Sequence, residues 1–529
     1  MSYLLHDLLR SSAHTRPDAI AVVDGERSIT YSELDTLSNQ IAHLLHETGV
    51  NKGDRVGLYL RKSLEAVAGA YGIMKAGAAY VPLDPEAPVD RIGYIISNCE
   101  IHTLLTSADK AGEWRHLVET TTLDSIVALD ATPDDSDLDL GGAHLYSPTD
   151  VAAQPGSEPK ARNIDLDLAL MLYTSGSTGN PKGVMLSHLN VMTFVQWAVA
   201  EFGVTAADRL SQVAPLHFDL STFDLYGAAL SGASVHLAPR QTSMFPMEMR
   251  KFIEEQQISV MYAVPSALSM LTERAKLEIG DLLGLKTILF AGEVFPTKYL
   301  SRIMRLLPHA VFANLYGPTE TNVCTYYLVT ERPSEDAPPI SIGKAIANVE
   351  TFVVKEDGTV AAPGEVGELY VRGASVMQGY WGDPERTTRS RIENTFSEGL
   401  SDPVYKTGDL VVEEADGNYT FLGRRDNQIK SRGYRIELGE IETALYAHPE
   451  IRECAAVAIP DEMITNRIKA YVVADGGLDP RSLTIFLGER IPKYMVPADF
   501  EFRDSLPKTS TGKIDRQSLL DLTESKERE

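Results

Sequence analysis

Alternating strand and helix patterns fill the first part of the chain and limit the folds open to it. Residues 32–48 carry apolar side chains at helical spacing, and residues 55–60 (RVGLYL) form a short apolar run typical of a buried strand. The same order repeats, with a helical pattern over residues 63–75 and a strand pattern over residues 79–83. Strands that alternate with helices are typical of parallel sheets covered by helices on both faces, so we expect a doubly wound α/β fold.

Further short apolar runs continue this plan at residues 234–237, 260–263, 287–290 and 311–313. Between the two groups of strands, residues 132–167 are acidic and rich in Asp, Pro, Gly and Ser. Such a composition is typical of surface loops, so we expect no core element there.

The last third of the chain has two other patterns. Residues 350–380 contain short β-rich runs broken by DG and PG turns, which predicts a small β subdomain built of hairpins. After Gly423, helical patterns at residues 437–447 and 483–489 flank strand patterns at residues 454–459 and 470–473. These form about 100 residues of α+β sequence, enough for a small separate domain.

Charge and cysteine content exclude several classes of protein. The 529 residues include 49 Lys and Arg against 74 Asp and Glu, a formal charge of −25, whereas nucleic-acid binders neutralise phosphates with basic surfaces. The three cysteines are far apart in the sequence and predict neither a disulfide framework nor a zinc site. No apolar run is long enough to span a bilayer and no signal peptide is recognisable, so we expect a cytoplasmic protein that binds neither membrane nor nucleic acid.

The most informative segment is a loop of ten residues, TSGSTGNPKG, that begins at Thr174 and lies between two apolar runs. Its glycines, hydroxyls and single lysine, Lys182, are suited to present N–H groups and one positive charge to phosphate oxygens. No Gly-Lys-Ser/Thr triplet opens a helix, so this is not a Walker loop. A flexible linker would not require the lysine.

Four other segments also predict chemistry. In NLYGPTET, Tyr316 offers a flat face for a base, and Thr319 with Glu320 offers oxygens to Mg²⁺. In YKTGDL, Asp409 is placed to accept the hydroxyls of a ribose. The charged segment 423–433 suggests a hinge that carries phosphate contacts, and the last segment, residues 508–516, contains Lys513. Taken singly, NLYGPTET is equally typical of an ordinary turn, YKTGDL is a weak signal, the charged segment 423–433 could be a solvated turn, and a lysine near the C-terminus is usually solvated surface.

Together, and in this order, the segments resemble the adenylate-forming enzymes: acyl-CoA synthetases, luciferases and the amino-acid adenylation domains of nonribosomal peptide synthesis. The resemblance covers nearly the whole chain and includes TYSEL from Thr30, KAGAAYVPLDP from Lys75, GELY from Gly367 and PKYMVP from Pro492. The AGAAYVPLDP version is similar to the peptide-synthetase branch. The resemblance implies an N-terminal adenylation core over residues 1–425 and a mobile C-terminal domain over residues 426–529, with ATP and Mg²⁺ as cofactors.

The resemblance also implies roles for individual residues. Lys513 would contact the carboxylate and the α-phosphate, Glu320 and Thr319 would lie at the α-phosphate and the magnesium, with Thr174 as a second metal ligand, and Asp426 would be the hinge. Phe421 stands where a tyrosine is usual near the ribose, so one hydroxyl is lost. The residues expected to bind ATP are Thr174, Ser175, Gly176, Ser177, Thr178, Gly179, Lys182, Gly292, Asn314, Tyr316, Asp409, Phe421 and Arg424.

The predicted substrate is an amino acid because Asp219 occupies the motif position that pairs with a substrate ammonium, and a carboxylate among apolar side chains is costly unless it is paired. No other pocket position carries a charge, which disfavours substrates with charged or amide side chains. The set resembles that of stand-alone prolyl-adenylate enzymes, so we expect L-proline, loaded onto a separate carrier protein that bears a phosphopantetheine thiol. The other predicted pocket residues are Leu220, Phe223, Ser266, Leu289, Ala291, Leu315, Val323 and Cys324.

Several alternatives remain open at this point. Alanine, valine, pipecolate or a β-amino acid would also satisfy Asp219, and free CoA is an alternative acceptor. An acyl-CoA ligase for an acid without an amine would not need Asp219. A catalytically silent sensor of ATP or adenylate is the alternative that is not an enzyme.

Overall fold

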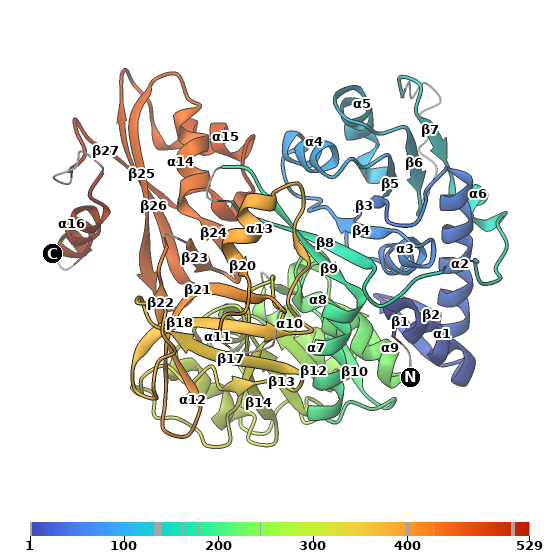
Figure 1. Cartoon of the computed structure of the whole chain (residues 1–529), viewed down its shortest axis with the longest axis horizontal. Helices are drawn as coiled ribbons and strands as arrows, with labels where there is room; N and C mark the ends of the chain where they lie inside the picture. The colour runs from blue at the N-terminus through green and yellow to red at the C-terminus, as the bar shows by residue number, and fades with distance from the viewer. Residues whose placement is uncertain are drawn as a thin grey trace.

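The computed structural model describes residues 3–131, 140–160, 162–176, 179–243, 245–396, 402–426, 428–508 and 514–527. Two large sheets, one five-stranded sheet and a smaller C-terminal unit make up the molecule (Figure 1). The α/β class predicted from the sequence is confirmed.

The first large sheet contains nine strands, and its central strands are parallel. Its order is β16-β15-β14-β13-β12-β10-β11-β1-β2, with an antiparallel pair at each edge. The strands are β16 (Lys344–Ala345), β15 (Thr325–Leu328), β14 (Val311–Tyr316), β13 (Thr287–Phe290), β12 (Val260–Ala263), β10 (Arg209–Gln212), β11 (Ser234–Leu237), β1 (Ile20–Asp24) and β2 (Arg27–Thr30).

The second large sheet contains eight strands in the order β19-β9-β8-β4-β3-β5-β6-β7. It is parallel from β8 to β7, and β9 and β19 add an antiparallel edge. The strands are β19 (Gly379–Tyr380), β9 (Lys182–Ser187), β8 (Leu168–Thr174), β4 (Ala79–Pro82), β3 (Arg55–Tyr59), β5 (Thr103–Thr106), β6 (Ser125–Ala128) and β7 (His144–Tyr146).

Helices cover both large sheets. The helix α2 begins where the sequence places it because Thr30 and Glu33 form a reciprocal capping box that satisfies its first N–H groups. The helices of this part are α1 (Leu5–Thr15), α2 (Tyr31–Glu47), α3 (Leu64–Lys75), α4 (Val89–Asn98), α5 (Ala111–Thr120), α6 (Pro148–Ala152), α7 (His188–Glu201), α8 (Leu220–Thr222), α9 (Ala228–Ser231), α10 (Pro246–Glu255), α11 (Pro265–Arg274) and α12 (Thr297–Leu306).

One prediction for this region is wrong. The acidic segment 132–167 was expected to be a surface loop without a core element, yet Val151 of α6 is buried in the main core, and β7 pairs with β6 at the edge of the second sheet. The strand is only three residues long and none of them is buried, so it left no apolar run in the sequence.

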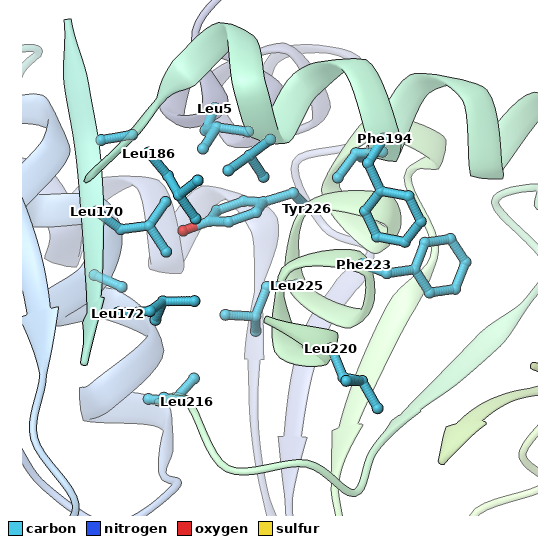
Figure 2. Packing of buried hydrophobic residues seen from close by; sticks show 14 of the residues in the cluster. Leu5, Leu170, Leu172, Leu186, Phe194, Leu216, Leu220, Phe223, Leu225 and Tyr226 are labelled. Atoms are coloured by element: carbon cyan, nitrogen blue, oxygen red, sulfur yellow. The ribbon is translucent and has the colours of Figure 1, made fainter. Parts of the chain in front are cut away.

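The main apolar core fills the space between the two large sheets (Figure 2). Tyr226 lies at its centre, between leucines of β8 and β9 and Phe194 of α7. The Tyr226 hydroxyl donates to the Tyr80 hydroxyl at 2.8 Å, so this deeply buried polar atom is satisfied. This packing holds in place the helical segment that carries Leu220 and Phe223, two of the predicted pocket residues.

The β-rich segment forms a five-stranded antiparallel sheet. A short helix, α13 (Pro384–Ser390), packs beside it. The strands are β17 (Val349–Val354), β18 (Val366–Gly373), β20 (Arg391–Ile392), β21 (Val404–Glu413) and β22 (Tyr419–Arg424).

The C-terminal unit has its own two apolar clusters, on either side of the sheet β25-β26-β27. A separate hairpin, β23–β24, precedes this sheet and points toward the rest of the molecule (Figure 1). The elements of the C-terminal unit are β23 (Gln428–Ser431), β24 (Tyr434–Glu437), α14 (Leu438–Tyr446), β25 (Ile451–Asp461), β26 (Thr465–Ala474), α15 (Pro480–Gly488), β27 (Asp499–Phe502) and α16 (Arg516–Glu527). We keep the boundary between residues 425 and 426 as a proposal.

Candidate active site

The glycine-rich loop connects the antiparallel strands β8 and β9 at the end of the second sheet. Thr174 and Lys182 are directly opposite each other at the loop's base, so their side chains lie on the same face. A Cβ at Gly176 would lie 2.0 Å from the carbonyl oxygen of Asn180, so this tight turn requires glycine. Gly179 lies in the same turn, whereas the predicted contacts of Ser177 and Thr178 fall outside the described residues.

Glu320 is the electrostatic centre of the site. It is fully buried, and its carboxylate lies 3.1 Å from the Lys182 ammonium and 2.5 Å from the Arg435 guanidinium. The Tyr380 hydroxyl also donates to it, at 2.7 Å. Burial by itself would raise the pKa of Glu320, but the two cations outweigh it and hold the pKa well below its ordinary value.

Asp409 and Tyr316 form the neighbouring part of the site. The Tyr316 hydroxyl donates to one oxygen of Asp409, and Arg424 lies 2.7 Å from the other. Arg424 also pairs with Asp426 at 2.7 Å, which connects the predicted ribose residue to the predicted hinge. Phe421 lies 6.4 Å from the Tyr316 ring, measured between centroids.

The predicted adenine residues lie near the carboxyl ends of β13 and β14. The Asn314 amide donates to the Ser341 carbonyl at 2.9 Å, and Gly292 follows β13 with a φ of 93°. The turn of the β23–β24 hairpin approaches Gly292 closely. Gly433 is required there, because a Cβ on it would lie 2.5 Å from a methyl carbon of Val264.

Asp219 begins the helical segment that carries the predicted substrate pocket. Burial raises the pKa of its carboxyl, and a hydrogen bond from the Thr319 side chain and the positive charge of Lys430 oppose that shift. Thr319 directly precedes Glu320, and the negative charge of Glu320 adds to the rise in the pKa of Asp219, so the two carboxylates lie near each other. A π-helix (Phe223–Gly227) follows directly, a rare element that is frequent at functional sites.

The predicted apolar pocket residues and Cys324 pack in the main core, against one face of the first sheet. Leu289 and Ala291 belong to the main core, whereas Ile288 and Phe290 of the same strand belong to a second cluster on the opposite face. The side chain of Ser266 is buried, and its backbone N–H donates to Glu293 at 3.0 Å. The predicted pocket residues that belong to this large main core cluster are Leu220, Phe223, Leu289, Ala291, Leu315, Val323 and Cys324.

The C-terminal unit touches the glycine-rich loop. The Ser175 hydroxyl donates to the carbonyl of Arg435 at 2.8 Å, and the Gly176 N–H donates to the Glu440 carboxylate at 3.3 Å. Glu440 also forms an ion pair with Arg91 of α4. Figure 1 shows β24 and α14 beside the ends of β8 and β9.

Lys513 lies outside the described residues. Its described neighbours are on the other side of the C-terminal sheet from the loop. The Lys508 ammonium pairs with Glu453 of β25 at 2.9 Å, and Ile514 packs against an apolar cluster of β25 and β26.

The donors at the loop fit a nucleotide and a hard cation. The Thr174 hydroxyl is buried and has no hydrogen-bond partner among the described residues, an arrangement that a ligand oxygen or a metal would satisfy. Glu320 adds carboxylate oxygens, the ligands that Mg²⁺ prefers. Lys182 adds the fixed positive charge for a phosphate.

The family model for AMP-binding enzymes matches residues 9–381, and the model for the AMP-binding enzyme C-terminal domain matches residues 440–513. The chain belongs to the AMP-binding enzyme family. Among the residues that the structure describes, no helix is long and apolar enough to cross a membrane.

Known relatives of this AMP-binding enzyme differ greatly in length. It is 37% identical over 527 residues to the L-proline--[L-prolyl-carrier protein] ligase of Pseudomonas fluorescens, and the match covers 98% of each protein. It is 36% identical over 516 residues to bacitracin synthase 1 of Bacillus licheniformis, of which it spans 9%. A structural match, at a TM-score of 0.86, 23% identity and 98% coverage of that chain, is the Vibrio cholerae adenylation domain AlmE in complex with glycyl-adenosine-5'-phosphate. That match covers 99% of the present chain and supports the fold.

Sequence reasoning missed four residues of this AMP-binding enzyme's site: Tyr380, Arg435, Glu440 and Arg91. The charged segment 423–433 was expected to carry cationic contacts, and Lys430 lies in it. The Lys430 ammonium lies 5.9 Å from the centre of the Tyr316 ring. The pattern of charge did not predict a role for Arg435 or Glu440, because both follow the glycine that ends the charged segment.

Proposed function

We propose that this enzyme activates a small apolar amino acid, best L-proline, as an aminoacyl adenylate with release of pyrophosphate. It then transfers the aminoacyl group to the phosphopantetheine thiol of a separate carrier protein. The observation that carries this proposal is the Asp219 carboxylate. It has a raised pKa and lies beside apolar pocket side chains and next to the residues at Glu320.

The first half-reaction brings two anions together, the substrate carboxylate and the α-phosphate of ATP. Positioning and charge neutralisation are therefore the main tasks of the protein. Lys182, the loop N–H groups and Thr174 would hold phosphate oxygens. Glu320 and Thr174 would hold Mg²⁺, which supplies charge neutralisation when it is bound.

The nucleoside would lie between Tyr316 and Phe421, with Gly292 and Asn314 at its base edge. Asp409, held by Arg424, would accept from the ribose hydroxyls. The lost hydroxyl at Phe421 leaves an aromatic face available for stacking. Thr319 would lie at the α-phosphate while its side chain also bonds to Asp219.

The choice of amino acid follows from the pocket. Asp219 would pair with the substrate ammonium, whether it is a primary amine or a ring nitrogen. The remaining predicted positions carry no charge, so a charged side chain on the substrate would remain unpaired at a cost of several kcal/mol. The full-length similarity to a proline ligase supports L-proline, and the apolar cluster supports a compact aliphatic substrate.

The second half-reaction requires room for a thiol. We propose that the C-terminal domain, residues 426–529, swings about Asp426 and presents Lys513 in the first step and the β23–β24 hairpin in the second. Lys513→Ala should then abolish adenylation and leave ATP binding intact, as measured by pyrophosphate exchange and calorimetry. Unchanged exchange in this variant would contradict its role.

The test of the proposed function is amino-acid-dependent ATP–pyrophosphate exchange with all proteinogenic amino acids, pipecolate, β-alanine and benzoate. We expect the dominant signal with L-proline. Exchange with another compact amino acid would support the proposed reaction and contradict the proposed substrate. Exchange with benzoate alone would contradict the proposed role of Asp219. Transfer to CoA in place of the carrier protein would contradict the proposed acceptor.

A further inference from the structure

An arginine that has no role so far lies at the glycine-rich loop. Arg386 belongs to α13, and one of its terminal nitrogens lies 3.7 Å from the point that a Cβ on Gly176 would occupy. Its guanidinium carbon lies 5.9 Å from the centre of the Tyr380 ring, and the Lys182 ammonium lies 4.6 Å from the same centre. Two cations therefore lie near one tyrosine ring beside the loop.

The edge of the second sheet holds α13 beside the loop. Tyr380 of β19 pairs with Val184 of β9, the strand that leaves the loop. The Tyr380 N–H donates to the Thr387 hydroxyl of α13 at 2.9 Å. The Asp383 carboxylate caps α13, because it accepts from the Arg386 N–H at 2.9 Å. All of these contacts precede the C-terminal unit in the chain, so they place α13 without it.

The charge of Arg386 is less fully compensated than the charge of Lys182. The Lys182 ammonium lies 3.1 Å from the buried carboxylate of Glu320. The described ion-pair partner of Arg386 is Asp383, whose carboxylate lies 3.4 Å from Nε, and both side chains are partly exposed. Exposed pairs of this kind contribute little. The terminal nitrogens of Arg386 make no hydrogen bond to any residue that the structure describes, so they are available to an anion.

The two cations also influence each other. Burial lowers the pKa of Lys182 to about 8, Glu320 opposes that shift, and the positive charges of Arg435 and Arg386 add to it. Lys182 and Arg386 therefore repel each other at the loop. An anion with several charges, bound between them, would relieve this repulsion.

We propose that Arg386 binds the β- and γ-phosphates of ATP and stabilises the leaving pyrophosphate. Glu320, proposed to lie at the α-phosphate, accepts from the hydroxyl of Tyr380, and Arg386 lies near the ring of that tyrosine. Arg386 is thus placed for the phosphates next to the α-phosphate. The planar guanidinium suits this task, since its paired N–H groups match two phosphate oxygens.

The role of Arg386 in the reaction follows from the bonds that change. A carboxylate oxygen of the amino acid forms a bond to the α-phosphorus, and the bond from the α-phosphorus to the bridging oxygen of the β-phosphate breaks. The electron pair of the broken bond stays on that oxygen. Arg386 stabilises the negative charge that develops there, so it acts on the transition state as well as on bound ATP.

This inference rests on the proposed function for the identity of the phosphate loop. Arg386→Met should bind pyrophosphate about 10- to 100-fold more weakly than the wild type, because charge-assisted hydrogen bonds are lost. AMP lacks the β- and γ-phosphates, so its affinity should not change. Arg386→Lys should recover part of the affinity for pyrophosphate, because lysine keeps the charge without the planar fork.

The experiment is calorimetric titration of the enzyme with pyrophosphate, and separately with AMP, in the presence of Mg²⁺ and without amino acid. The matched control is Arg389→Met on the same helix, which removes an exposed ion pair with Glu385 at 3.1 Å. This control should leave both affinities unchanged. An unchanged affinity for pyrophosphate in Arg386→Met, or an equal loss of affinity for pyrophosphate and AMP, would overturn the proposal.

A kinetic measurement tests the stabilisation of the leaving group. In ATP–pyrophosphate exchange with the best amino acid, Arg386→Met should raise KM for pyrophosphate and lower kcat, and Arg389→Met should change neither. Wild-type values of both constants in Arg386→Met would contradict the role of Arg386. Failure of the proposed function would instead appear as no exchange with any acid in the wild type, whereas the calorimetric test needs no amino acid.

Discussion

The two carboxylates of the candidate site, Glu320 and Asp219, influence each other's charge but have opposite environments. Glu320 is fully buried among Lys182, Arg435 and Tyr380, which hold its pKa well below the ordinary value. Burial raises the pKa of Asp219, and a side-chain hydrogen bond from Thr319 and the charge of Lys430 only oppose that shift. Two acids whose environments shift their pKa values apart have different tasks. Lys182 and Arg435 keep Glu320 charged, whereas a substrate ammonium would supply the close cation for Asp219.

The largest effect is expected when the charge at Glu320 is removed. Glu320→Gln would leave Lys182 and Arg435 without their shared anion, so we expect a loss of about 10²- to 10³-fold in pyrophosphate exchange. Stability should also fall, by about 3–5 kcal/mol, as measured by chemical denaturation.

The control for this variant is Glu335→Gln, which removes an exposed partner of Arg302 at 2.9 Å. Its stability should change by less than about 1 kcal/mol and its exchange rate should not change. Equal effects of the two substitutions would show that Glu320 has no special place in the site.

The next largest effect is expected at the apolar side chains of the predicted substrate pocket. Leu289 and Ile288 are adjacent and fully buried, but they face opposite clusters. Both Leu289→Ala and Ile288→Ala should lose about 2–5 kcal/mol of stability. Only Leu289→Ala should raise exchange with pipecolate relative to L-proline, by about 10- to 200-fold. The same preference in both variants would mean that Leu289 does not line the pocket.

A smaller effect is the pH dependence of amino-acid binding. The raised pKa of Asp219 means that its carboxylate gains a proton, and loses its charge, at a higher pH than an ordinary aspartate. As the pH falls through that pKa, KM for the amino acid should rise, by about tenfold for each further pH unit. Asp219→Asn should abolish this dependence. A wild-type KM that stays constant down to about pH 4 would contradict the assignment.

The smallest effect is expected at Phe421. Phe421→Tyr adds the hydroxyl that the resemblance leads one to expect near the ribose. A single hydrogen bond contributes about 1 kcal/mol, so KM for ATP should change by less than about fivefold. A larger change would mean that the departure at Phe421 matters for nucleotide binding.

The sequence predicted the parts of the fold that depend on local patterns. The strands at residues 234–237, 260–263 and 287–290 have the predicted bounds, because each is a short apolar run between polar turns. The strand β7 was missed because it is held at a sheet edge by pairing and buries no side chain. Local periodicity contains no information about such pairing.

The residues of the candidate site also fall into two groups, those that local patterns predict and those that only tertiary contacts bring together. Glycine spacing and the Thr319–Glu320 pair are local signals, and they identified the residues that the structure brings together at the loop. Arg435 and Glu440 reach this loop through the docking of a separate unit, more than 250 residues away in sequence. Nothing in the spacing of charges near them predicts that contact.

One experiment would show whether the enzyme recognises an amine through Asp219. Exchange is measured with the best amino acid and with the same acid lacking its amine, which for L-proline is cyclopentanecarboxylate. We expect the wild type to prefer the amino acid by about 10⁴-fold in kcat/KM, and Asp219→Ala to lose most of this preference. Equal use of both acids by the wild type, or an undiminished preference in Asp219→Ala, would contradict it.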